Sequence, residues 1–159
     1  MFSEGKMTTT RRSGVVALLA GITVAAGLCL APAQATTSGQ YQRGIFSATN
    51  HQRAVHDRSA FRHQACVQRF AERQARRMAD QERMFHQDLG RVLSRCHLHK
   101  AGENVAYGFD LGVAVVNLGW MHSPDHRANI LDPDFRLLGA GARRGDNGVW
   151  YAAQVFGRR

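Results

Sequence analysis

The first apolar stretch of the chain runs from Val15 to Leu30 and is preceded by Arg11 and Arg12. It is followed by Ala33-Gln34-Ala35, and a basic start, an apolar run and an A-x-A site are typical of a secretory signal peptide. The apolar run is shorter than the roughly 20 residues that a membrane-spanning helix needs. We therefore expect residues 1–35 to be a signal peptide that is cleaved after Ala35.

Beyond this segment the pattern indicates one domain. Residues 36–44 are polar without apolar periodicity, so we expect a disordered linker, then a domain over residues 45–159 that begins with a helix from Phe46 to about Asp57. In the second helix, apolar positions recur at helical spacing on one face, and the arginines elsewhere are interpreted as a solvated face. The apolar positions are Val67, Phe70, Ala71, Met78 and Ala79, and the arginines are Arg69, Arg73, Arg76 and Arg77.

The next two helices are predicted from different signals. Residues 111–121 are apolar at most positions, which predicts a helix that is buried on most sides and capped by Asp110. Ser123 and Pro124 suit the N-cap and the first position of a further helix. Asp132-Pro133 would end that helix.

The C-terminal part indicates a β-hairpin. Residues 138–144 and 149–156 flank Asn147-Gly148, a dipeptide that tolerates positive φ and favours a tight turn. Gly139 and Gly141 weaken the first strand and indicate close approach of a helix or loop. With helices on both faces of a small antiparallel sheet, the chain is predicted to be an α+β protein, an α-β-α sandwich.

Charge narrows the choice of partners. The chain has 21 Lys and Arg against 12 Asp and Glu, and its net charge is +9 at pH 7. Three of the basic residues and one acidic residue fall in the first 35 positions, so 18 and 11 remain. A basic domain can bind nucleic acid, but export argues against that partner and favours anionic cell-envelope polymers or lipid head groups. The alternative is a soluble surface of high pI without an anionic ligand.

Two cysteines, Cys66 and Cys96, remain after the signal peptide, because Cys29 lies within it. In an exported chain, one pair of thiols suggests a disulfide. This bond would join the second helix to the loop before Glu103. Two buried free thiols are the alternative.

Several motifs occur in an order that resembles one protein family. They are Gly102-Glu103-Asn104, a helix that ends at Trp120, the run Ser123-Pro124-Asp125-His126-Arg127-Ala128-Asn129-Ile130-Leu131, and the closing strand Tyr151-Ala152-Ala153-Gln154-Val155-Phe156-Gly157. From about Ile45 to Arg159 the chain resembles the bacterial, SCP-like extracellular branch of the CAP superfamily (cysteine-rich secretory proteins, antigen 5 and pathogenesis-related proteins). The resemblance implies the sandwich fold and a short strand at Met84–His86 that ends in a cavity histidine. It implies no single activity, because one fold hosts unrelated functions.

By this resemblance His86 and Glu103 line the family's cleft, and they are the main site candidates. A carboxylate beside a histidine can orient the ring and raise its basicity for proton transfer, or support the ring as a metal ligand. A buried hydrogen-bonded pair that fixes the loop is a third interpretation. Asn104, Arg127 and Asn129 are interpreted as structural.

The chain departs from the two-histidine zinc site of many eukaryotic relatives. Their second glutamate is absent, and Tyr151 stands where their second histidine opens the closing strand. His126 can approach the cleft instead, although a structural role at a helix terminus is the alternative. The expected cleft residues are therefore His86, Glu103, His126 and Tyr151. Three N or O ligands can hold a divalent metal, and we expect at most weak zinc binding through His86 and His126.

Two functions follow from these candidates. The first is a secreted, non-enzymatic CAP-domain module that binds a lipid, a cell-envelope polymer or a protein through the cleft of His86 and Glu103. The alternative is a metal-assisted, peptidase-like hydrolase that uses the same two residues. Of the groups that such an enzyme needs, only the base is evident in the sequence. We expect a monomer without a stable membrane span, with no nucleic acid partner and no cofactor other than zinc.

Overall fold

The computed structural model describes residues 36–159, so the predicted signal peptide lies outside the described residues. The helical elements are α1 (Ser38–Val55), α2 (Ala65–Asp80), α3 (Leu89–Cys96), α4 (Gly112–Ala114), the π turn η1 (Val115–Gly119), the 3-10 turn η2 (Trp120–His122) and α5 (Pro124–Leu131). The strands are β1 (Arg62–His63), β2 (Lys100–Tyr107), β3 (Leu137–Arg144) and β4 (Trp150–Arg158). Within residues 36–159, no helix combines the length and the apolar character needed to cross a membrane.

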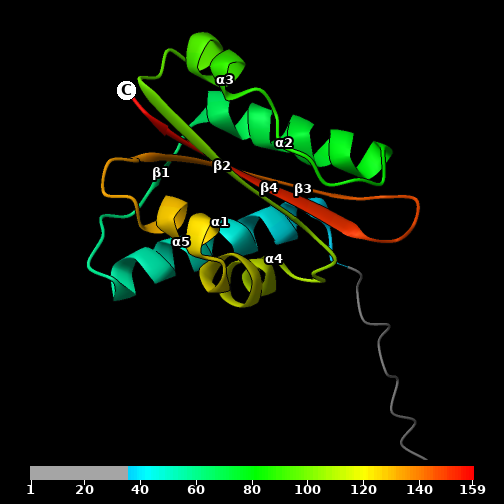
Figure 1. Ribbon diagram of the computed structural model, residues 1–159. Coiled ribbons are helices and arrows are strands. Elements are labelled where there is room, and N and C mark those ends of the chain that lie inside the picture. The colour runs from blue at the N-terminus through cyan, green and yellow to red at the C-terminus, as the bar shows by residue number, and fades with distance from the viewer. Residues whose placement is uncertain (1–35) are drawn as a thin grey trace, which may run out of the picture. The chain divides into compact units, whose positions relative to one another are not determined.

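The strands form one sheet in the order β1-β3-β4-β2, which leaves β2 at an edge. Helices α2 and α3 cover one face, and α1, α4 and α5 cover the other (Figure 1). This arrangement confirms the predicted α+β sandwich. The sheet is mixed rather than wholly antiparallel, because the two-residue strand β1, which we did not predict, pairs with β3 in parallel.

Close packing of α2 on β3 explains the two strand glycines. A Cβ atom at Gly139 would lie 2.4 Å from the backbone N of Gln68, and one at Gly141 would lie 2.1 Å from the carbonyl O of Ala71. The predicted close approach is therefore confirmed, and α2 is the element that makes it. The apolar face of α2 is buried against the sheet, while its arginines stay exposed.

Helix α1 begins earlier than predicted, so the expectation of a disordered linker over residues 36–44 is wrong from Ser38 onward. Thr37 and Gln40 form a capping box, in which each side chain accepts a hydrogen bond from the other residue's backbone N–H at 3.2 and 2.8 Å, respectively. Tyr41 then packs its ring 4.8 Å from that of Trp150 and donates a hydrogen bond to the carbonyl of Phe109. Polar capping and this single aromatic anchor order a stretch without apolar periodicity.

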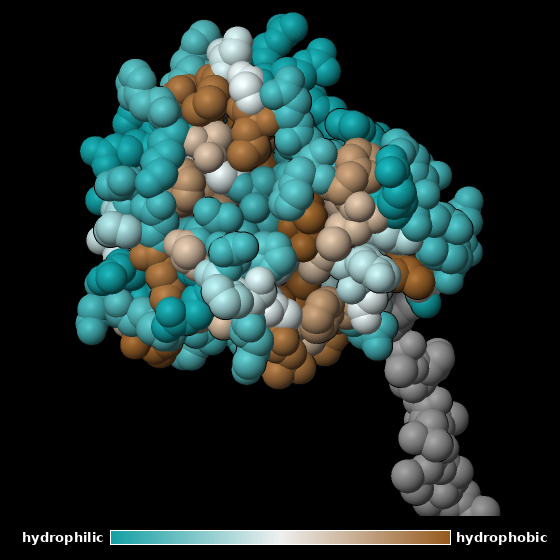
Figure 2. Space-filling model, viewed as in Figure 1, coloured by the Kyte–Doolittle hydropathy of each residue, from teal (hydrophilic) through white to brown (hydrophobic). Residues whose placement is uncertain are grey.

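The segment predicted as one helix over residues 111–121 is irregular and only partly buried. It passes from the three-residue α4 into the π turn η1 and the 3-10 turn η2. Leu111, Val113 and Leu118 are exposed, so the expected burial on most sides is wrong. On the face of the molecule drawn in Figure 2, a hydrophobic patch lies at the lower edge, over α4 and the turns after it. Leu118 points outward, while Val116 and Trp120 stay in the core.

Two smaller expectations concern the cap of α4 and the turn of the hairpin. Leu111 occupies the N-cap of α4, and no side chain caps it, so Asp110 is not the cap. The hairpin connection spans residues 145–149, and Gly148 alone among them has positive φ, at 76°. The N–H of Gly148 donates to the carbonyl of Gly145 at 3.0 Å, which closes the predicted tight turn, and the Asn147 side chain accepts from the N–H of Val149 at 3.0 Å.

Candidate functional site

His86 and Glu103 meet beside the edge strand β2. Glu103 lies on β2 opposite Val155 of β4, and His86 comes from the irregular segment between α2 and α3. The Nδ1 atom of His86 is 2.7 Å from Oε2 of Glu103. The side chain of His86 is 61% exposed, whereas that of Glu103 is 1% exposed. A buried carboxylate thus supports an exposed ring.

Gln87 completes the hydrogen bonding of this carboxylate. Oε2 of Glu103 also accepts from the backbone N–H of Gln87 at 3.1 Å, and Oε1 accepts from the Gln87 side-chain amide at 2.6 Å. Burial raises the pKa of the Glu103 carboxyl, and the hydrogen bonds from Gln87 and His86 oppose that rise. Gln87 was missed in the sequence, because no periodicity marks a residue that acts through both its backbone and its side chain.

The segment that carries His86 is held by side chains and not by a strand. No strand is present over Met84–His86, so the short strand implied by the family resemblance is wrong. The side-chain amide of Gln74 donates to the carbonyl of Phe85, and the Glu103 carboxylate binds the next two residues. These bonds replace a ladder of backbone pairs and leave the His86 ring free to project.

The hydrogen bond to Glu103 determines which ring nitrogen of His86 is open. With Nδ1 engaged, Nε2 on the opposite side of the ring remains for a ligand or solvent. Within residues 36–159, Glu103 is the one hydrogen-bond partner of this ring. A neutral ring can accept a proton at Nε2, and a protonated ring can donate a hydrogen bond to an anion.

His86 lines a groove of about 760 Å³ between α2 and α3. Five exposed arginines line the same groove. They are Arg69, Arg73 and Arg77 of α2 and Arg91 and Arg95 of α3. The α2 arginines are exposed as predicted, but sequence reasoning did not bring the α3 arginines to face them. Their i, i+4 spacing places Arg91 and Arg95 on one face of α3, but it does not indicate that this face meets α2.

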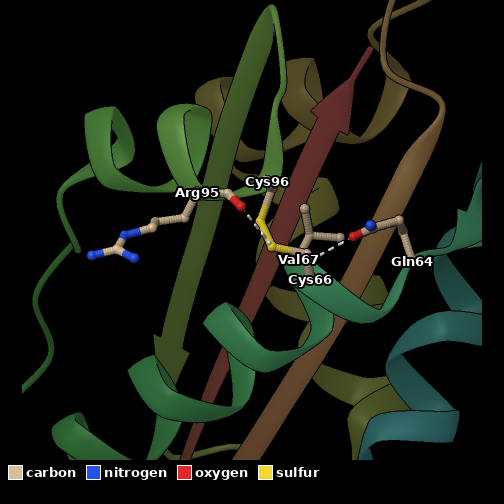
Figure 3. Close-up of a disulfide and its surroundings, with 5 residues drawn as sticks. All are labelled: Gln64, Cys66, Val67, Arg95 and Cys96. Atoms are coloured by element: carbon tan, nitrogen blue, oxygen red, sulfur yellow. Dashed lines mark hydrogen bonds between the residues drawn. A yellow bond between two sulfur atoms is a disulfide. The ribbon is translucent and has the colours of Figure 1, made fainter.

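A disulfide between Cys66 and Cys96 joins the start of α2 to the end of α3 (Figure 3). The two Cα atoms are 5.6 Å apart, within the usual range for such a bond. The predicted disulfide is therefore confirmed, with the difference that Cys96 is the last residue of a helix and not part of a loop. Cys66 also lines the groove, so the bond fixes the spacing of both walls at one end.

On the other face of the sheet, Asn104 belongs to a buried polar network. Its amide donates to the carbonyl of His126 at 3.0 Å and to the side chain of Gln154 at 3.1 Å. Asn129 donates to the Asn104 side chain at 3.0 Å, and Gln154 donates to the hydroxyl of Thr49 at 2.5 Å. The structural interpretation of Asn104 and Asn129 fits this network. Gln154 and Thr49 were missed, because single polar residues in apolar segments show no pattern.

His126 and Tyr151, the other two expected cleft residues, differ in how they relate to His86 and Glu103. Burial lowers the pKa of the half-buried His126, and the charge of His86 acts in the same direction. Tyr151 is four positions along β4 from Val155, the partner of Glu103, an offset of about 13 Å at strand spacing. Its hydroxyl accepts a hydrogen bond from Asn147, and within residues 36–159 no hydrogen bond joins Tyr151 to the pair. Its place in the cleft stays a prediction.

The donor set for a metal is small. Within residues 36–159, no three His, Cys, Asp or Glu side chains group so that they could hold one ion. Both oxygens of Glu103 accept N–H donors, which leaves the rings of His86 and His126. Two imidazoles are fewer than the three protein ligands of a catalytic zinc site. The residues therefore do not fit a zinc centre, and a weak two-histidine site stays a prediction.

A family model described as the cysteine-rich secretory protein (CAP) family matches residues 46–156. Among solved structures, an extracellular protein with an SCP domain from Bacillus anthracis is 28% identical with a TM-score of 0.68, and the match covers 77% of this chain and 41% of that protein. A cysteine-rich secretory protein from Staphylococcus aureus is 19% identical with a TM-score of 0.67, and 79% and 40% are covered. An outer surface protein from Borrelia burgdorferi is 16% identical with a TM-score of 0.65, and 74% and 91% are covered.

These similarities differ in what they support. Below 25% identity, the Staphylococcus and Borrelia proteins support the fold alone. The chain spans about two fifths of the length of the Bacillus and Staphylococcus proteins. A search of curated proteins finds no match.

Proposed function

Because the chain belongs to the cysteine-rich secretory protein (CAP) family, we propose that it acts as a secreted, non-enzymatic binding module. Its ligand is a lipid, a cell-envelope polymer or a protein, held where His86 and Glu103 meet. One observation carries the proposal: an exposed imidazole is fixed by a buried carboxylate and opens on a groove. A side chain held in this way is pre-organised, which lowers the entropy cost of binding.

Secretion is supported by three observations. The sequence begins with the pattern of a signal peptide. The disulfide between Cys66 and Cys96 is typical of proteins in oxidising compartments. The Bacillus neighbour is an extracellular protein, and the Borrelia neighbour is an outer surface protein.

Binding without turnover is favoured because the pair supplies a base and little else. A hydrolytic site needs a nucleophile or an activated water, a base, and a group that stabilises developing charge. Within residues 36–159, no hydroxyl or thiol hydrogen-bonds the His86 ring. Cys66 and Cys96 are bonded to each other and supply no thiolate.

A peptidase-like hydrolase that uses His86 and Glu103 is the second candidate. The 2.7 Å contact between the two side chains favours it, because a carboxylate in this position orients a histidine for proton transfer. A metal ion would supply an activated water there. The donor set of His86 and His126 is too small to support that role, so this function ranks second.

The test compares two histidine variants of the secreted, oxidised protein. His86→Ala removes the exposed ring of the site, and His51→Ala removes an exposed ring of α1 outside it. Each protein is incubated with purified bacterial cell walls and, separately, with vesicles of total bacterial lipid, and sedimentation measures the bound fraction. Mass spectrometry of the supernatants detects hydrolysis products.

We expect His86→Ala to reduce retention on one of these materials, His51→Ala to leave it unchanged, and no sample to release products. Equal retention of all three proteins would contradict a site at His86. Products that form with wild type and disappear with His86→Ala would establish the hydrolase instead.

A further inference from the structure

The groove beside His86 is walled by two rows of arginines at helical spacing. Arg69, Arg73 and Arg77 lie four residues apart on α2, which sets about 6 Å between successive positions and about 12 Å along the row. Arg91 and Arg95 repeat the same spacing on α3 across the groove. Charges spread in this way match an extended ligand with regularly placed anionic groups. A small anion would contact one or two of them.

These five arginines are not neutralised by neighbouring acids. Within residues 36–159, none of their guanidinium groups takes part in a salt bridge, whereas Lys100 and Arg158 both pair with Asp134. Asp88 is the one acidic residue that lines the groove. Its carboxylate accepts hydrogen bonds from the backbone N–H groups of Gly90 and Arg91 as the cap of α3. The positive charge of these five arginines therefore faces solvent. When no ligand is bound, the two rows repel each other.

Aromatic rings hold two of the guanidinium groups in place. The guanidinium of Arg73 lies 4.4 Å from the ring centroid of Phe70, and that of Arg77 lies 5.1 Å from that of Phe85. A stacked guanidinium keeps its N–H edge available, and that edge can donate two parallel hydrogen bonds to a phosphate or carboxylate. The stacking therefore orders the arginines before an anion arrives.

The floor of the groove holds an unused acceptor. Gln74 lines the groove and is 1% exposed. Its amide N–H donates to the carbonyl of Phe85, while its Oε1 atom has no hydrogen-bond partner in the described residues. A buried acceptor without a partner is rare in proteins. A hydroxyl group of a ligand would satisfy it, and an anionic oxygen would not.

We propose that this groove binds a linear polyol phosphodiester chain, with its phosphates on the two arginine rows and a polyol hydroxyl on Oε1 of Gln74. This inference rests on the proposed binding function and names the ligand class of the same site. A three-carbon polyol phosphate repeat advances by a distance close to the arginine spacing. Its phosphates carry free oxygens for the guanidinium edges, and its alcohol group supplies the donor that Gln74 lacks. A chain of carboxylates such as oligoglutamate offers no hydroxyl.

The test uses fluorescence anisotropy of a labelled synthetic oligo(glycerol phosphate) with the oxidised protein. The double variant Arg73→Gln/Arg91→Gln removes one charge from each wall. Arg76→Gln/Arg143→Gln is the matched control, because it removes two exposed charges, one of them on α2, that do not line the groove. Gln74→Leu removes the Gln74 acceptor together with the hydrogen bond to the carbonyl of Phe85, so oligoglutamate binding is measured on the same variant as its control. Thermal unfolding verifies that every variant is folded.

We expect the wall variant to weaken binding at least about tenfold and the control less than about threefold, since charge-assisted hydrogen bonds exceed screened surface charge in strength. Gln74→Leu should weaken binding of the polyol phosphate but not of oligoglutamate with the same charge. Equal losses in the wall and control variants would overturn the groove as the site. Binding of oligoglutamate or of a single-stranded oligodeoxynucleotide with equal or higher affinity would overturn the polyol phosphate assignment.

The two proposals can fail separately. If His86→Ala reduces retention on cell walls or vesicles while wild type does not bind oligo(glycerol phosphate), the binding function stands and the ligand class is wrong. Suppose instead that wild type binds oligo(glycerol phosphate), the wall variant does not, and wild type is retained on neither cell walls nor vesicles. The anion site then stands, and the proposed function is wrong.

Discussion

Glu103 and Asn104 are neighbours on β2, yet their side chains serve opposite faces of the sheet in opposite ways. Asn104 joins a network toward α1 and α5 that is closed by Gln154 and Thr49. Glu103 turns toward α2 and α3 and supports the exposed ring of His86. The first arrangement satisfies its groups internally, and the second leaves a ring nitrogen open. The contrast separates residues that stabilise the fold from residues that are available to a ligand.

Breaking the disulfide should have the largest effect on stability. Cys66→Ala/Cys96→Ala opens a link across 30 residues of sequence, which predicts a loss of about 3–4 kcal/mol in the free energy of unfolding. Urea titration of the variant and of oxidised wild type measures this. The groove side should suffer most, since the bond joins α2 to α3. Unchanged stability would show that packing alone holds these helices together.

Asn104→Ala should come next, because it breaks the closed network. Gln154, Asn129 and the carbonyl of His126 lose a buried partner, which predicts a loss of about 3 kcal/mol in the free energy of unfolding. Asn117→Ala is the control, since Asn117 is only partly buried and accepts one side-chain hydrogen bond, from Gln52. The same urea titration should show about 1 kcal/mol for the control. If both variants lost the same free energy of unfolding, the network would have no special structural role.

Glu103→Ala tests the side of the sheet where Glu103 supports the exposed ring of His86. Removing the carboxylate frees His86 and Gln87, and we expect a loss of about 2 kcal/mol in stability together with weaker ligand retention. Thermal unfolding and the cell-wall and vesicle assays are run on the same preparation. Glu103→Gln keeps the shape and one acceptor, so it should lose less of both. A variant with wild-type stability and retention would mean that the carboxylate does not support His86.

The smallest effect concerns pH and His126. Burial lowers the pKa of His126 below its ordinary value of 6.5, so the unfolded chain takes up a proton that the folded chain does not. The free energy of unfolding should therefore fall as pH falls from 6.5 to the lowered pKa. His126→Gln should reduce this slope in urea titrations across that range. Identical slopes in wild type and His126→Gln would place His126 in a solvated environment.

Local sequence signals predicted much of the fold, and single contacts explain where the prediction failed. The apolar face of α2 was predicted from its repeated apolar spacing. The helix from Pro124 to Leu131 and the C-terminal hairpin were predicted from the cap and turn residues that bound them. The start of α1 depends on one capping box, and the course of residues 111–121 depends on one π turn. Such features leave no periodic trace.

The candidate site was predicted only in part for a related reason. His86 and Glu103 were found through motifs of a known family, and the structure places them 2.7 Å apart. The facing of Arg91 and Arg95 toward α2 depends on the packing of two helices and on the disulfide between them. Proximity of this kind follows from tertiary contacts, which spacing within one helix does not encode.

His86→Ala tests the central claim most directly, when retention on cell walls and lipid vesicles and the free energy of unfolding are measured on the same sample. Gln87 still donates two hydrogen bonds to Glu103 in this variant, so stability should change by less than about 1 kcal/mol. Retention on the material that wild type binds should fall well below that of wild type. Wild-type retention, or a loss of stability as large as that of Asn104→Ala, would contradict the account.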